Sequence, residues 1–198
     1  MDKNMFCFQC QEAAGNVGCK VRGVCGKQPD TATLQDALVD ASKGLAVAIR
    51  QKGGAVEHAD GNLLQHALFV TITNANFDDA AIAATARRVQ ARRDELLADT
   101  DRSELPACAR RQMETIDDML ARQDEISVLS TENEDQRSLR ELLIYGMKGI
   151  AAYGHHATAL GFEDDELYDF FVDGLVSTTQ ELSQDEMIGW VMKAGDHA

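Results

Sequence analysis

Hydrophobic residues recur at helical spacing along most of this chain. From residue 34 to residue 49, apolar side chains stand three or four positions apart, which places them along one face of a helix. Strand signals are few, and only two prolines, Pro29 and Pro106, interrupt the sequence. We therefore predict an all-α protein. Its main helices are expected at about 34–49, 62–73, 78–98, 104–123, 138–159 and 184–194.

Capping residues support several of these boundaries. Asn76 and Asp78 are candidates for the start of the third helix, because their side chains accept hydrogen bonds from free backbone amides. Ser183 and Glu186 have the spacing of a capping box at the start of the last helix. Gly161 is expected to end the fifth helix.

A weak internal repeat runs through the chain at an offset of 105 residues. Residues 30–46 and 135–151 share the order of their acidic and aliphatic positions, and Lys43 matches Lys148. The repeat indicates two duplicated helical bundles. Chance similarity between amphipathic helices of biased composition is the alternative.

The repeat and the cysteine content together predict three segments. We expect two three-helix bundles that form one compact unit, preceded by an N-terminal cysteine-rich segment that we call the cysteine loop. The cysteine loop covers residues 1–29, the first bundle 30–125 and the second bundle 126–198.

Charge and hydropathy exclude two classes of partner. The net charge is -14, which would repel a phosphate backbone and disfavours nucleic acid. No stretch approaches the roughly 18 consecutive apolar residues that a membrane span needs, and the mean hydropathy is -0.27. We therefore expect a protein that binds neither nucleic acid nor a membrane.

The cysteines are the main chemical signal. Four of the five lie in the first 25 residues, in the pattern C-x2-C-x8-C-x5-C. No secretory leader precedes them, so a cytoplasmic location is expected, where clustered thiols indicate metal binding or catalysis. We expect these four residues to hold one metal centre: Cys7, Cys10, Cys19 and Cys25.

Spacing alone leaves the metal open. An iron–sulfur cluster, [4Fe–4S] or [2Fe–2S], suits four thiolates flanked by glycines, because the backbone must approach the inorganic sulfides closely. A structural zinc suits the same four ligands. A redox C-x-x-C pair is a weaker interpretation, because no strand precedes Cys7.

The charged residues near the cysteines are mostly basic. Lys20, Arg22 and Lys27 outnumber the single acid Glu12 between residues 10 and 30. This local excess suits an anionic cluster, which carries a net charge of about -2 with four thiolates. Three solvated surface cations are the alternative.

The stretch FCFQCQEAAGNVGCKVRGVCGKQPDTATLQDAL closely resembles the start of the hybrid cluster proteins, also called prismane proteins or hydroxylamine reductases, in their anaerobe-type class. The resemblance continues through ITNANFDDA, LSTENEDQRSLRELLIYGMKGIAAYGHHATALGF and LSQDEMIGWVMKAG, and covers nearly the whole chain. It implies that the four cysteines bind a [4Fe–4S] cluster and that two three-helix bundles surround it.

The resemblance also implies two further domains and a second cluster, for which this sequence has no residues. Full-length family members continue into two α/β domains, which hold a hybrid iron–sulfur–oxygen cluster where hydroxylamine or nitric oxide is reduced. None of the motifs for that cluster occurs in the 198 residues. The family therefore implies an oxidoreductase, whereas this chain by itself is expected to lack the catalytic site.

Other candidate residues are expected to have ordinary roles. Cys108 is predicted to be a buried or idle thiol. His155 and His156 are adjacent and point in different directions, so surface or capping roles are expected for them. The acidic residues at 163–166 are expected to form the first turn of a helix.

Three functions follow from these observations. The first is an electron-transfer module that needs a redox partner protein, a catalytic subunit or a second copy of the chain; its acidic surface would favour a partner with a basic patch. The second is the N-terminal part of a hydroxylamine or nitric oxide reductase, as a short paralogue or a piece of a longer protein. The third is a sensor or structural domain that a metal clamps together.

Overall fold

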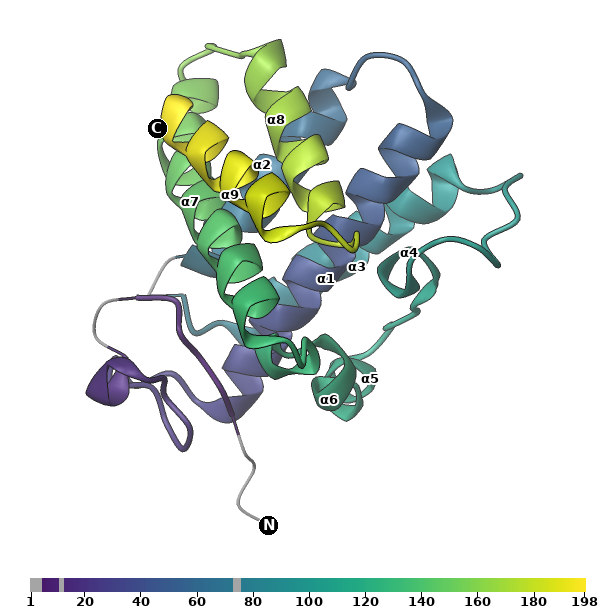
Figure 1. The fold of residues 1–198 in the computed structure, drawn as a ribbon. Helices are drawn as coiled ribbons and strands as arrows, with labels where there is room; N and C mark the ends of the chain where they lie inside the picture. Colours follow the sequence, from purple (N-terminus) through teal and green to yellow (C-terminus); the bar gives the residue numbers. More distant parts are fainter. Residues whose placement is uncertain (1–4, 11–12, 73–75) are drawn as a thin grey trace.

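The fold is described from a computed structural model, which covers residues 5–10, 13–72 and 76–198. These residues form helices and irregular segments and contain no β-strand, so the all-α prediction is confirmed. The helices gather around α1 (Pro29–Lys52) (Figure 1). The described residues of the cysteine loop lie beside the start of that helix and are irregular apart from a short 3-10 helix, η1 (Ala14–Asn16).

The helix α1 (Pro29–Lys52) is the centre of the molecule. Pro29 occupies its first turn, where the missing N–H costs nothing, and Gly53 follows its end with φ 77°. Residues on every side of α1 are buried, because α2, α3, α4 and α8 all pack against it. The predicted helix over 34–49 lies inside α1.

Two further predicted helices are confirmed. The helix α2 (His58–Ile72) matches the expectation for 62–73, although Thr73 lies outside the described residues. The helix α3 (Asp79–Leu96) begins at the predicted cap, where the Asp78 side chain accepts a hydrogen bond from the Ala81 amide. Capping of this kind satisfies an amide that the first turn leaves free.

The single helix predicted over 104–123 is wrong. Three short pieces occupy the region, with extended backbone between the first two: α4 (Ala107–Arg110), α5 (Ile116–Ala121) and α6 (Gln123–Ile126). A short 3-10 turn, η2 (Val128–Ser130), follows them.

Buried polar side chains of α3 explain the break. The Arg93 guanidinium, which is fully buried, donates to the carbonyls of Cys108 and Arg111 at 2.9 and 2.7 Å. The Gln90 amide both donates to and accepts from the Met113 backbone. These bonds satisfy backbone groups that a continuous helix would have used, so tertiary contacts override the helical propensity of the sequence.

The helices predicted over 138–159 and 184–194 lie inside α7 (Glu134–Ala159) and α9 (Gln184–Asp196). Between them lies α8 (Asp165–Ser177), for which the sequence predicted only an acidic first turn. Gly161 follows α7 with φ 86°, Asp164 caps α8, and Ser183 and Glu186 form the predicted capping box of α9.

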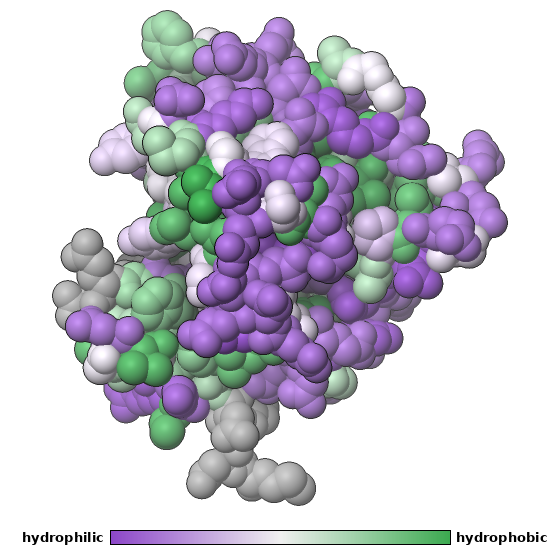
Figure 2. Space-filling view, in the orientation of Figure 1, coloured by the Kyte–Doolittle hydropathy of each residue, from purple (hydrophilic) through white to green (hydrophobic). Residues whose placement is uncertain are grey.

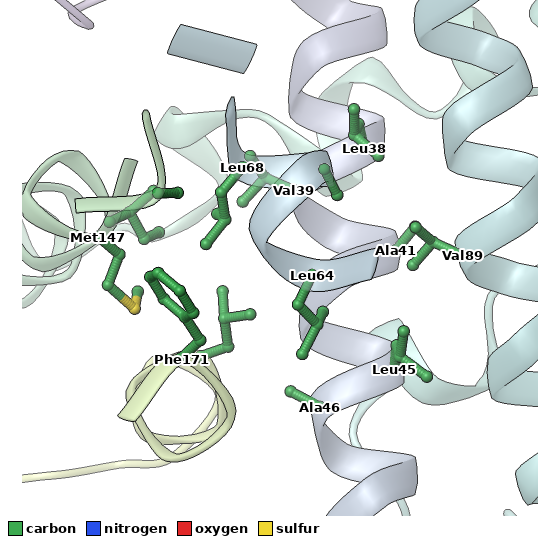
Figure 3. Packing of buried hydrophobic residues seen from close by; sticks show 14 of the residues in the cluster. Leu38, Val39, Ala41, Leu45, Ala46, Leu64, Leu68, Val89, Met147 and Phe171 are labelled. Atoms are coloured by element: carbon green, nitrogen blue, oxygen red, sulfur yellow. The ribbon is translucent and has the colours of Figure 1, made fainter. Parts of the chain in front are cut away.

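One apolar core joins the two halves of the chain. Leu64 and Leu68 of α2 lie between α1 on one side and Met147 of α7 and Phe171 of α8 on the other (Figure 3). The shared core agrees with one compact unit. The internal duplication and the boundary at residue 126 stay predictions. Within the described residues, no helix combines the length and the apolar run that a membrane crossing requires.

Candidate metal centre

Two of the four cysteines are paired by their backbones. The Cys7 amide donates to the Cys19 carbonyl at 3.1 Å, and the Cys19 amide donates to the Cys7 carbonyl at 2.9 Å. Such a mutual pair brings two residues directly opposite each other. Cys19 is buried and Cys7 is half-buried against it, together with Met5 and Ala32.

The other two predicted ligands stand in separate turns. Cys10 is half-buried, and its carbonyl accepts from the Ala13 amide at 3.3 Å. Cys25 is exposed within a turn that the Gly23 amide closes onto the Lys27 carbonyl at 2.8 Å. All five cysteines are free thiols. Among the residues that the structure describes, no three Cys, His, Asp or Glu side chains are arranged to hold an ion.

Two glycines allow the tight packing of the cysteine loop. A Cβ atom on Gly18, where φ is 144°, would stand 2.6 Å from the Phe6 ring. A Cβ atom on Gly23 would stand 3.1 Å from Cys25 Sγ. A side chain at either position would therefore displace a neighbour, and the loop is built closely around its sulfur atoms.

A buried lysine contacts one of the sulfurs. Lys27 Nζ lies 3.6 Å from Cys7 Sγ and donates to Gln35 Oε1 of α1 at 2.6 Å. Lys27 is 2% exposed, whereas Lys20 and Arg22 are exposed. Burial raises the pKa of the Cys7 thiol, and the charge of Lys27 opposes that rise. The alternative of three solvated surface cations is therefore wrong for Lys27, which is buried and contacts a candidate ligand.

Two further buried ionisable side chains, Asp36 and Lys148, interact electrostatically with Lys27. Burial and the Glu141 carboxylate raise the pKa of the Asp36 carboxyl to about 7, while Lys148 and Lys27 oppose that rise. Burial lowers the pKa of the Lys148 ammonium to about 8, against the attraction of Glu141 and Asp36. Both side chains are almost completely buried.

Asp36 and Lys148 border a polar cavity of about 70 Å³. Its walls are formed by α1, α7 and the chain from α6 to Thr131, and Gln9 is the lining residue from the described part of the cysteine loop. Three buried polar atoms on its wall have no hydrogen-bond partner among the described residues: Gln9 Oε1, Asp40 Oδ2 and Arg140 Nε. Such a polar and roomy space suits ordered water, which would satisfy these atoms.

Sequence reasoning missed Asp36 and Lys148 as part of this region. One signal was present, because Asp36 and Glu141 stand in the same 105-residue register as Lys43 and Lys148. All four line the same cavity. Their burial was not readable from the sequence, because charged residues are mostly exposed.

The remaining candidates lie away from the cysteine loop. Cys108 is 5% exposed, as predicted, and burial raises its pKa to about 11, so it is an inert thiol. His155 stacks on Phe69 with ring centroids 4.6 Å apart. Of the acidic residues expected in a first turn, Asp165 and Glu166 lie in the first turn of α8, whereas Asp164 is its cap and Glu163 precedes it. The Glu163 carboxylate accepts a hydrogen bond from Asn62 and contacts His58.

The residues of the cysteine loop fit an iron–sulfur cluster by chemistry. Four thiols are available, glycines leave room for close backbone approach, and a buried cation stands beside Cys7. The fit is incomplete in arrangement, because only Cys7 and Cys19 are paired.

Comparisons with known proteins agree with the motifs. The hydroxylamine reductase of Desulfosudis oleivorans is 45% identical over 201 residues, and that of Nitratidesulfovibrio vulgaris is 46% identical over 208 residues. The hydroxylamine reductase of Desulfitobacterium hafniense is 44% identical over 203 residues. Each alignment covers 98% of this chain but 37% of the relative, so the chain spans little more than a third of their length.

The matched part is the N-terminal part of these relatives. Residues 5–198, which include all four candidate ligands and every described helix, match the Prismane/CO dehydrogenase family. The chain therefore belongs to the Prismane/CO dehydrogenase family.

Proposed function

We propose that this chain is an iron–sulfur electron-transfer module. In this proposal one [4Fe–4S] cluster is held by the four cysteines of the cysteine loop and exchanges one electron at a time. Proteins of this family bind iron–sulfur clusters. The observation that carries the proposal is the backbone pair of Cys7 and Cys19 with the buried Lys27 ammonium at Cys7 Sγ.

The proposal explains why a lysine is buried beside Cys7. A [4Fe–4S] cluster with four thiolates carries a net charge of about -2, and a buried anion is costly without a nearby cation. Lys27 supplies such a cation and is itself held in place by Gln35 of α1. Four thiolates on one zinc ion would carry the same charge, so the metal must be identified by analysis.

Cluster binding would also complete the cysteine loop. The bound cluster would draw Cys10 and Cys25 toward the pair formed by Cys7 and Cys19. Gly26, which has φ 97° and follows Cys25, gives this turn a backbone conformation that favours glycine. Metal binding and ordering of the loop are coupled in this way in other small metal sites.

The test is anaerobic purification followed by counts of iron, sulfide and zinc and by visible absorption. We expect a brown protein with about four iron atoms and four sulfides per chain, as this cluster type requires, and absorption that bleaches reversibly on reduction. A colourless protein with one zinc ion and no iron would contradict the proposal and favour a domain that a metal only clamps together.

A second candidate is favoured by the comparisons. The relatives are hydroxylamine reductases, and this chain corresponds to 37% of their length. The chain would then be the N-terminal part of such a reductase, and its cluster would supply electrons to a catalytic part outside these residues. Hydroxylamine reduction by the cluster-loaded chain distinguishes the two, because turnover well above that of a free cluster would contradict an electron-transfer role alone.

A further inference from the structure

One side of α7 faces away from the helices that it packs against. Those neighbours are α2, α8 and α9, and in Figure 1 α7 lies at the edge of the helical body. Residues three, four or seven positions apart lie on the same side of a helix. Six exposed or half-buried residues of α7 have this spacing, and we call them the α7 stripe: Leu142, Tyr145, Gly149, Ala152, Tyr153 and His156.

The α7 stripe contains no Asp, Glu, Lys or Arg, although these residues make up 26% of the chain. The three such residues between positions 139 and 159 line the polar cavity instead: Arg140, Glu141 and Lys148. Hydrophilic side chains dominate the face of the molecule drawn in Figure 2.

The stripe exposes large side chains in place of charged ones. Leu142 is 52% exposed, Tyr145 43% and Tyr153 83%. Exposed tyrosines on a surface without charge are typical of the central part of a protein interface.

Gly149 is an independent sign of a close contact. Glycine is less stable than alanine inside a helix, so each glycine of α7 needs an explanation. A Cβ atom on Gly146 would stand 3.3 Å from Ala194, and one on Gly154 would stand 2.4 Å from Gln65, so packing within the chain explains both. A Cβ atom on Gly149 would meet no described atom within 4 Å. A glycine there leaves room for another polypeptide to approach the backbone of α7.

We propose that the α7 stripe is the contact surface for a second copy of this chain, in which the two α7 helices cross near Gly149. The contact is isologous, so the same stripe serves both copies across a two-fold axis. The proposal goes beyond electron transfer and does not depend on a bound cluster.

Charge favours a second copy as the occupant. Each chain carries a net charge of -14, so two copies repel each other unless uncharged surfaces meet. The α7 stripe offers such a surface on both copies. A basic partner, which the net charge would otherwise favour, finds no carboxylate on the stripe with which to pair.

The two ends of α7 favour an antiparallel crossing. The first turn of α7 contains Glu134 and Asp135, and a parallel arrangement would bring these acids of both copies together. An antiparallel crossing at Gly149 keeps them apart. It places Tyr145 of one copy beside Tyr153 of the other, because each tyrosine stands four residues, about one helical turn, from the crossing.

The experiment measures the dissociation constant of the dimer by sedimentation of the anaerobically purified chain over a range of concentrations. The test variant is Gly149→Leu, which fills the point of closest approach. The matched control is Ala91→Leu, which adds the same side chain at an exposed position of α3, a helix that packs against α1 and α2.

We expect Gly149→Leu to raise the dissociation constant about tenfold or more, because overpacking at a close contact is costly. Ala91→Leu should stay within about twofold of the unchanged chain. The melting temperature of Gly149→Leu, measured on dilute monomer, should not fall, since leucine forms helix better than glycine. Weaker dimers from a less stable monomer would contradict a role in contact.

A charge pair tests the antiparallel crossing. Tyr145→Lys and Tyr153→Glu should each weaken the dimer about fivefold or more, because a charge would be buried alone. The double variant joins the two charges across the contact and should recover most of the loss. Additive losses in the double variant would overturn this crossing.

A chain that stays monomeric up to about 1 mM, where even a weak contact is populated, would overturn the second copy as occupant. The stripe would then be left for a different polypeptide, such as the remainder of a longer reductase. Iron counted in the same samples keeps the two proposals apart. Normal iron in a monomer contradicts only the contact surface, and a dimer without iron contradicts only the electron-transfer module.

Discussion

The cysteine loop and α1 meet at Pro29 but depend on different interactions. Leu38 and Leu45 of α1 are fully buried among apolar neighbours from other helices (Figure 3). In the cysteine loop, the described backbone is held by a few hydrogen bonds such as the two between Cys7 and Cys19, and side chains such as Val21 face solvent. The body is thus stabilised by apolar burial, which the loop largely lacks.

The two regions therefore differ in what stabilises their folded conformation. A helical body with a continuous apolar core folds without a cofactor. A loop with little buried apolar surface gains much of its order from whatever its thiols bind. We therefore expect that the two regions can be disrupted separately, and that loss of the body removes the loop but not the reverse.

The largest expected effect comes from removing the cysteine pair. Cys7→Ser with Cys19→Ser should abolish iron binding completely, because two of the four candidate ligands are lost. The helical circular dichroism should stay close to that of the unchanged protein. Cys108→Ser is the control, since this thiol is buried in an apolar cluster with Leu97 and Ala109 that is separate from the cluster of Cys19, and it should retain full iron content. Loss of helix in the cysteine-pair variant would contradict the separation of the two regions.

A core substitution should act on the body. Leu45 is fully buried in α1, so Leu45→Ala is expected to lower the free energy of unfolding by about 2–5 kcal/mol. Leu142 of α7 is 52% exposed, and Leu142→Ala should change it by less than about 0.5 kcal/mol. Urea unfolding of the metal-free chain measures both. Similar losses in the free energy of unfolding for the two variants would contradict the burial of Leu45 in the apolar core.

Asp36 should give the body a dependence on pH. Its pKa is raised to about 7 in the folded protein, against a usual value of 3.8. Between these values the folded state keeps a proton that the unfolded state has lost, so stability should fall as pH rises from about 4 to about 7. Asp36→Asn, which resembles the protonated acid, should remove this slope. Urea unfolding across that pH range tests it, and identical slopes would contradict the prediction.

Lys27 contacts both Cys7 in the cysteine loop and Gln35 in α1. We expect its substitution to have a smaller effect than those above. Lys27→Gln removes the positive charge at Cys7 Sγ, so the extra electron of a reduced cluster is stabilised less. The reduction potential should become roughly 60 mV more negative, which corresponds to about 1.4 kcal/mol for one electron. Lys20→Gln is the exposed control and should shift the potential much less. Redox titration measures both potentials, and equal shifts in the two variants would contradict a specific role for Lys27.

The smallest effect is expected at His58. Its ring nitrogens lie 2.7 and 2.6 Å from carboxylate oxygens of Glu163 and Asp165, and these hydrogen bonds raise the pKa of His58 above 6.5. This link between α2 and α8 should be fully present below pH 6.5 and lost as pH rises through the raised pKa. His58→Gln should flatten that part of the stability profile. A rise in stability over the same range would contradict it.

The sequence predicted the all-α class and most of the helices, because helices with clear caps are specified locally. The capping residues Asp78 and Ser183 stand where the sequence placed them. The region around 104–123 failed for a nonlocal reason, since the buried side chains of Gln90 and Arg93 hold its backbone in a broken form. Local propensity cannot report such contacts.

The candidate site was predictable only in part. Spacing made the four cysteines candidate ligands, which stay a prediction. The burial of Lys27 was not predictable, because its neighbours in sequence, Gly26 and Gln28, do not show that it points toward Cys7. Asp36 and Lys148 come together from helices more than one hundred residues apart. Their shared cavity depends on packing, which periodicity alone does not describe.

One measurement tests the central claim most directly, namely that the four cysteines hold a cluster that accepts a single electron. It is the electron paramagnetic resonance spectrum of the anaerobically purified chain before and after reduction, with iron counted in the same sample. We predict a silent oxidised protein and, on reduction, about one unpaired spin for every four iron atoms, as a [4Fe–4S] cluster gives. A protein without iron, or one whose iron gives no spin signal at any potential, would contradict the account.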